Sequence, residues 1–81
     1  MRNELVWFAI EQEKILKEND WKSNWVNFPA KEMFESLLDE VEELENAINE
    51  KARGEIKKEC LDVANYAMMI YDIINNGGEI E

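Results

Sequence analysis

The sequence predicts an all-α protein, a helical bundle of about three helices per chain that is completed by oligomerisation. Apolar residues recur at helical spacing in three segments, and no segment alternates apolar and polar residues as a half-buried strand would. The chain has 81 residues and one cysteine, so it is too short to bury all of these apolar faces alone and cannot form an internal disulfide. We expect a single domain over residues 1–81.

The first helix is predicted over about residues 3–18. Its main apolar face carries Leu5, Phe8, Ala9, Ile15 and Leu16. Val6, Trp7 and Ile10 lie off this face, which indicates a second buried contact, with another subunit as its natural source. The alternative is that part of this second face is simply exposed to solvent. We therefore expect a homo-dimer or a homo-tetramer.

The second helix is predicted over about residues 29–53 and the third over about residues 55–75. Pro29 suits the first position of a helix, and Gly54 is a stop signal because glycine accepts the left-handed conformation found past a helix end. The third helix is apolar on nearly every side. The predicted core stripe of the second helix is Phe34, Leu37, Leu38, Val41, Leu44 and Ile48.

The composition excludes several classes of function. With 19 acidic and 9 basic residues the net charge is −10, which argues against a nucleic-acid polymer or an anionic membrane as partner. Histidine is absent, so structural zinc sites and Ser-His or Cys-His catalysis lack a usual component. The single cysteine, Cys60, favours a reduced, cytoplasmic location.

Two pairs of acidic residues, each three residues apart, lie on the second and third predicted helices. Glu40 and Glu43 follow the edge of the apolar stripe, where side chains one turn apart can hold one ion. Glu59 and Asp62 project in core directions of an almost wholly apolar helix, where an unpaired carboxylate is costly. Glu45 also falls within the apolar arc of the second helix and has no evident role.

If the second and third helices pack antiparallel, the two acidic pairs converge. An all-oxygen ligand set without histidine suits Mg²⁺, with Mn²⁺ as a possible substitute, rather than zinc or copper. Periodicity leaves an alternative open, in which the four carboxylates are the solvated surface of an acidic helical hairpin.

The same residues resemble a known family. The run LLDEVEELENAI, followed by EIKKECLDVANYAMMIYDII, is similar to the MazG-type pattern of Glu-Glu-x-x-Glu, a spacer and Glu-x-x-Asp. The resemblance implies an all-α dimer or tetramer that hydrolyses nucleoside triphosphates to monophosphate and pyrophosphate with Mg²⁺. By position it implies that the metal ligands and catalytic residues are Glu40, Glu43, Glu59 and Asp62. Asp39 departs from the glutamate that the family has there.

Five further residues are candidates for contact with the nucleotide: Lys17, Lys22, Trp25, Lys58 and Asn65. The lysines suit phosphate oxygens and Trp25 suits a stacked base, but solvated lysines and a core-capping tryptophan are the alternatives. Asn65 suits a base, a sugar or a metal-bound water. The expected function is nucleotide pyrophosphohydrolysis in nucleotide-pool cleaning. The alternative is a non-enzymatic helical oligomer, a binding or regulatory module that keeps the acidic shell.

Overall fold

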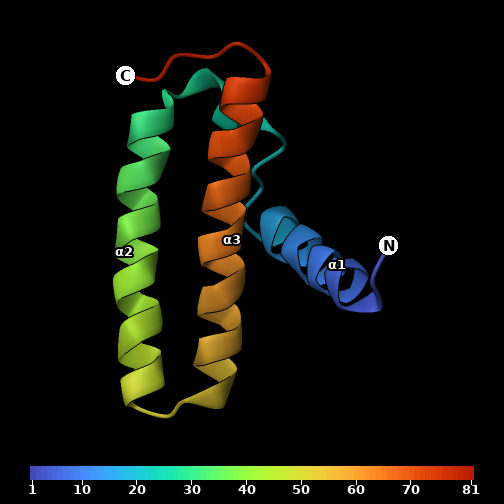
Figure 1. Cartoon of the computed structure of the whole chain (residues 1–81), viewed down its shortest axis with the longest axis vertical. Helices are drawn as coiled ribbons and strands as arrows, with labels where there is room; N and C mark the ends of the chain where they lie inside the picture. Colours follow the sequence, from blue (N-terminus) through green and yellow to red (C-terminus); the bar gives the residue numbers. More distant parts are fainter.

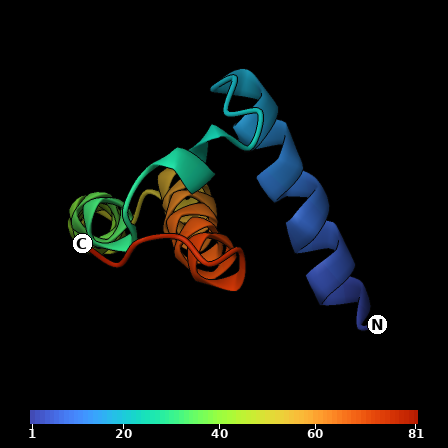
Figure 2. The ribbon, with the colours of Figure 1, turned by 90° about the horizontal axis from the view of Figure 1, so that it is seen from above.

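The computed structural model describes residues 1–81 and consists of helices and their connections. The elements are α1 (Asn3–Glu18), a 3₁₀ helix η1 (Asn24–Asn27), α2 (Ala30–Asn49) and α3 (Arg53–Asn75). No residue lies in a strand, which confirms the all-α prediction. The helices α2 and α3 form an antiparallel hairpin, and α1 projects from the far side of α3 (Figures 1 and 2). None of the helices combines the length and apolarity needed to cross a bilayer.

The turn between α2 and α3 differs from the prediction. The expected stop at Gly54 is wrong, because α2 ends before Lys51, which takes the left-handed conformation with φ 57°. The amide of Lys51 donates to the carbonyl of Ile48 at 3.0 Å, and that of Ala52 donates to Ala47 at 3.1 Å. This pair of bonds satisfies the last carbonyls of the helix and terminates it without glycine. Gly54 lies instead in the first turn of α3.

The buried core lies where the connector between α1 and α2 crosses the open end of the hairpin. Its members are Trp25, Ala30, Met33, Met69 and Ile73. The indole Nε1 of Trp25 donates to Asp72 Oδ2 at 2.9 Å, so this ring is held against α3. The first amides of α2 donate to the carbonyls of Glu79 and Ile80 at 2.9 and 2.8 Å. The C-terminal tail therefore caps the N-terminus of α2.

Much of the apolar stripe predicted for the core of α2 is exposed in the single chain. Met33, Glu40 and Ala47 face α3 instead, so the docked face lies about a quarter-turn from the predicted one. By the same helical count, exposed apolar residues of α3 lie on the same side of the hairpin as those of α2. This apolar flank consists of Phe34, Leu38, Val41 and Ile48, each 44–53% exposed, together with Ala67, Tyr71 and Ile74. The acidic side chains Glu43 and Asp62 lie on the opposite side of the hairpin.

Candidate metal centre

Three glutamates meet across the interface between α2 and α3. Glu40 and Glu43 stand one turn apart on α2, and Glu59 faces them from the early part of α3. Each offers a carboxylate oxygen, and these oxygens all lie within 4.8 Å of one another. The antiparallel hairpin therefore brings together three of the four acids that the sequence singled out.

Two of these carboxylates each have one buried oxygen without a hydrogen-bond partner. Glu59 is only 5% exposed, and the Oε2 atoms of Glu59 and Glu40 are both buried with no hydrogen-bond partner. Burial, the proximity of Glu59 and the charges of Glu43 and Asp62 raise the pKa of Glu40 to about 8. Without a divalent cation, a proton on Glu40 relieves part of this repulsion at neutral pH.

The chemistry of the cluster fits a hard divalent cation. Its donors are carboxylate oxygens alone, which is the set that Mg²⁺ and Mn²⁺ prefer, and histidine and cysteine ligands are absent. The unpartnered oxygens of Glu40 and Glu59 are placed to become ligands, because a bound cation would satisfy both at once. The cation would also replace the proton that the metal-free site holds.

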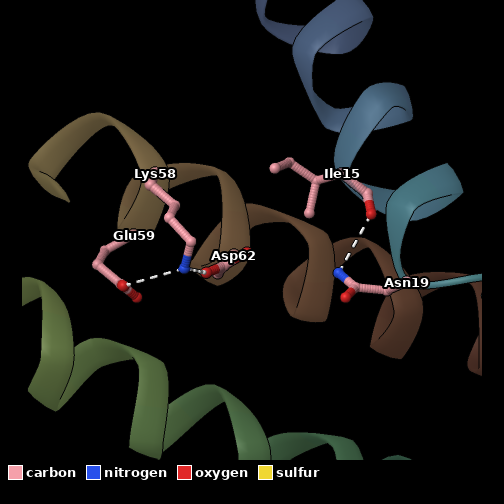
Figure 3. Close-up of polar contacts among 5 residues, drawn as sticks. All are labelled: Ile15, Asn19, Lys58, Glu59 and Asp62. Carbon is pink, nitrogen blue, oxygen red and sulfur yellow. Dashed lines mark hydrogen bonds and ion pairs between the residues drawn. The ribbon is translucent and has the colours of Figure 1, made fainter. Parts of the chain in front are cut away.

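Asp62 does not join the three glutamates. It projects from α3 one turn after Glu59, and its Oδ2 accepts a hydrogen bond from Lys58 Nζ at 3.3 Å. The same ammonium group lies 3.6 Å from Glu59 Oε1, so it bridges the two acids of α3 (Figure 3). The fourth predicted ligand is thus paired with a lysine.

A cavity of about 440 Å³ opens beside this cluster, between α1 and the hairpin. Its lining comprises Ile15, Glu18 and Asn19 of α1, Trp21 of the connector, Glu40 of α2, and Lys58, Asp62, Asn65, Tyr66 and Met69 of α3. The lining therefore combines acids and a lysine with aromatic and apolar side chains. Its volume is in the range of small-molecule sites.

Asn65 lines this cavity, but its side-chain amide is engaged in hydrogen bonds with α1. It is 3% exposed, its Oδ1 accepts a hydrogen bond from Gln12 Nε2 at 3.1 Å, and its Nδ2 donates to the Gln12 carbonyl at 3.4 Å. These are the only side-chain hydrogen bonds between α1 and α3. Asn65 holds α1 in place, and α1 in turn forms one wall of the cavity.

The other predicted nucleotide contacts are not brought to the acids. Lys17, Lys22 and Trp25 line a separate cavity of about 240 Å³ on the other side of the connector. Lys22 pairs with Asp20 at 3.2 Å, and Trp25 is 7% exposed with its indole nitrogen bound to Asp72. Only Lys58 among the basic candidates adjoins the acidic cluster.

Two aromatic residues line the larger cavity: Trp21, for which the sequence favoured a core-capping role over base stacking, and Tyr66, which was missed as a candidate. Trp21 and Tyr66 stand edge to face, with ring centroids 6.3 Å apart and an angle of 88° between their planes. Burial and the charges of Glu40 and Asp62 raise the pKa of Tyr66, so its hydroxyl stays protonated at neutral pH. The spacing of Tyr66 four residues after Asp62 was a usable signal, since such residues share a helix face. No signal in the sequence distinguishes Trp21 from Trp25.

Comparison with known proteins returns nothing that extends this description: no family model, curated protein or solved structure matches the chain.

Proposed function

We propose that this protein is a Mg²⁺-dependent nucleotide pyrophosphohydrolase, which converts nucleoside triphosphates to monophosphates and pyrophosphate. The observation that carries the proposal is the cluster of Glu40, Glu43 and Glu59, with unpartnered buried oxygens, at the edge of a ligand-sized cavity. The resemblance of the acidic pattern to MazG-type enzymes supports the same reaction. Mn²⁺ is expected to substitute for Mg²⁺.

In this proposal, the position of each residue defines its role in the reaction. The three glutamates hold the metal, and a bound divalent cation neutralises phosphate charge and lowers the pKa of a water molecule. Lys58 adjoins the cluster and can contact phosphate oxygens. Trp21 and Tyr66, which line the same cavity, offer aromatic surface to the base. A carboxylate oxygen not engaged with the metal accepts the proton of the attacking water.

The active unit in this proposal is a homo-dimer or homo-tetramer in the cytoplasm. The apolar flank and the exposed Leu5, Trp7 and Ile10 of α1 support self-association, because these side chains are 50–62% exposed on α1 and nothing in one chain covers them. The same exposure favours the alternative, a binding module without catalysis. An assay for activity separates the two.

The test is Mg²⁺-dependent release of pyrophosphate from a panel of canonical and modified nucleoside triphosphates. With a responsive nucleotide in hand, Glu59→Gln should lower kcat/KM by more than the roughly 10–100-fold that outer-shell partners of metals contribute. Glu45→Gln is the matched control, because Glu45 is an exposed acid of α2 outside the cluster, and it should retain activity.

Stability must be measured in parallel. The metal-free Glu59→Gln protein should melt at the same or a higher temperature, because the change relieves the repulsion among the clustered carboxylates and leaves Lys58 paired with Asp62. Full turnover by Glu59→Gln would refute the metal assignment. Absence of pyrophosphate release from every nucleotide would favour the binding module.

A further inference from the structure

Lys58 is the only basic side chain paired with any acid of the candidate metal centre. Its Nζ lies 3.3 Å from Asp62 Oδ2 and 3.6 Å from Glu59 Oε1. The two carboxylates are only 16% and 6% exposed, whereas the lysine side chain is 55% exposed. The acids are therefore largely enclosed by the hairpin, and the lysine that bridges them is the solvent-exposed member of the group (Figure 3).

We propose that Lys58 is a resident counter-ion that the divalent metal displaces, and that the displaced ammonium group then pairs with the phosphates of the nucleotide. The inference rests on the proposed metal centre and adds how that centre is regulated. In the metal-free protein Lys58 neutralises part of the acidic charge and keeps Asp62 out of the cluster. Displacement frees Asp62 to join Glu40, Glu43 and Glu59.

The chemistry of lysine suits this exchange. Its ammonium group is a compact charge on a flexible stem, so it can leave one carboxylate and reach another anion without backbone movement. Lysine is cationic at neutral pH, and the ammonium group of Lys58 lies within ion-pair distance of both acids. A dication and an ammonium group that share Glu59 repel each other, which means that both cannot hold this carboxylate at full strength.

The exchange couples metal and phosphate binding. The metal alone must displace Lys58 from two carboxylates and leaves the ammonium group without a partner. A metal that arrives with a triphosphate supplies the partner, so each ligand should strengthen the binding of the other by the same factor. The substrate class is therefore a polyphosphate that carries its own cation, in agreement with the strongly negative net charge of −10.

The test measures Mn²⁺ binding to the metal-free protein by titration calorimetry, without nucleotide. Lys58→Met should bind Mn²⁺ about threefold to tenfold more tightly than the natural protein, from the size of exposed ion pairs. Lys57→Met is the matched control, since Lys57 lies next in the chain, lines a separate apolar groove and carries the same charge. It should change the affinity less than twofold. Lys58→Arg should behave like the natural protein, and Lys58→Gln should follow Lys58→Met.

A second titration uses Mn²⁺ with a non-hydrolysable imidotriphosphate nucleotide. The nucleotide should increase Mn²⁺ affinity more in the natural protein than in Lys58→Met. Circular dichroism of each variant checks that the helices remain formed, and Lys58→Gln serves if Lys58→Met is unfolded.

The outcomes are distinguishable. Equal Mn²⁺ affinities for the Lys58→Met and Lys57→Met proteins would overturn the exchange and leave the metal centre standing. Weaker binding by Lys58→Met would also overturn it, because Lys58 would then support the ligands rather than compete with the metal. Failure of every protein to bind Mn²⁺ would overturn both the centre and the exchange.

Discussion

Glu40 is the residue of the candidate metal centre whose protonation is most altered by the fold. Its pKa is raised from the usual 4.5 to about 8, so between these pH values the folded chain holds a proton that the unfolded chain releases. The folded state then binds more protons than the unfolded state, and the free energy of unfolding must fall as the pH rises through this window.

We therefore expect the melting temperature of the metal-free protein to fall by several degrees when the pH is raised from about 5.5 to about 8.5. The Glu40→Gln variant should lose much less, because its side chain does not titrate. Thermal melts in the presence of a chelator, followed by circular dichroism, measure both. Parallel loss of stability in the two proteins would contradict the assignment, and Mg²⁺ should restore the natural protein at high pH.

Lys51 carries a second residue-level prediction. The left-handed conformation costs a non-glycine residue about 1–2 kcal/mol of stability. Glycine adopts this conformation without the steric penalty, so a change to glycine should remove part of that cost. Lys51→Gly should raise the free energy of unfolding by about 0.5–1 kcal/mol, and Gly54→Ala should raise it by a similar amount because Gly54 is helical with open space around it. Urea titration of both variants measures this. Destabilisation by Gly54→Ala would place the helix break at Gly54 after all.

At the scale of elements, α1 is the least secured helix, because it contacts α3 alone and contains no fully buried residue. The hydrogen bonds between Gln12 and Asn65 hold it. Gln12→Ala removes the partner of a buried amide oxygen, which should cost about 1–3 kcal/mol. The loss should be local.

Hydrogen exchange measures this effect directly. Amides of α1 should exchange faster in Gln12→Ala, while those of the α2–α3 hairpin keep their protection. Glu13→Ala is the control, since Glu13 is an exposed neighbour with no hydrogen bond to α3. Uniform loss of protection in all three helices would show that α1 is an integral part of one cooperative unit. In an active protein Gln12→Ala should raise KM more than it lowers kcat, because α1 forms a wall of the cavity.

At the scale of the whole molecule, the apolar flank leaves the hairpin incomplete. A second copy that packs its own flank against it would form a four-helix core and bury side chains that are now half exposed. We expect sedimentation at micromolar concentration to give a dimer or a larger assembly. Val41→Asp should dissociate it, because it places a charge at the centre of the flank.

Val26 provides the matched control for this experiment. It is 40% exposed, close to the 44% of Val41, but belongs to η1 and lies outside the flank. Val26→Asp should leave the assembly intact. A folded monomer of the natural protein at these concentrations would contradict the prediction, as would equal dissociation by both variants.

The local sequence pattern was sufficient to predict several features of this molecule. The three helical segments, the bounds of α1 and the burial of Glu59 follow from the spacing of apolar residues and from one acid in an apolar run. The meeting of Glu40, Glu43 and Glu59 also follows, once two adjacent helices pack antiparallel. These features depend on neighbours three or four positions apart, which a linear sequence displays.

Other features depend on how the helices dock, and periodicity does not contain that information. The orientation of α2 about its own axis places Met33 and Ala47 against α3 and leaves Val41 exposed. The apolar stripe of α2 is wide, so its sequence is compatible with docking through either edge of the stripe. Asn65 pairs with Gln12 across 53 positions of sequence, and Trp25 with Asp72 across 47, so the polar atoms of both side chains are engaged in contacts that no local pattern displays. The pairing of Asp62 with Lys58 was visible in the sequence, because the two residues stand four positions apart on one helix, but only the docking of α2 on α3 decided that Asp62 lies outside the cluster of three glutamates.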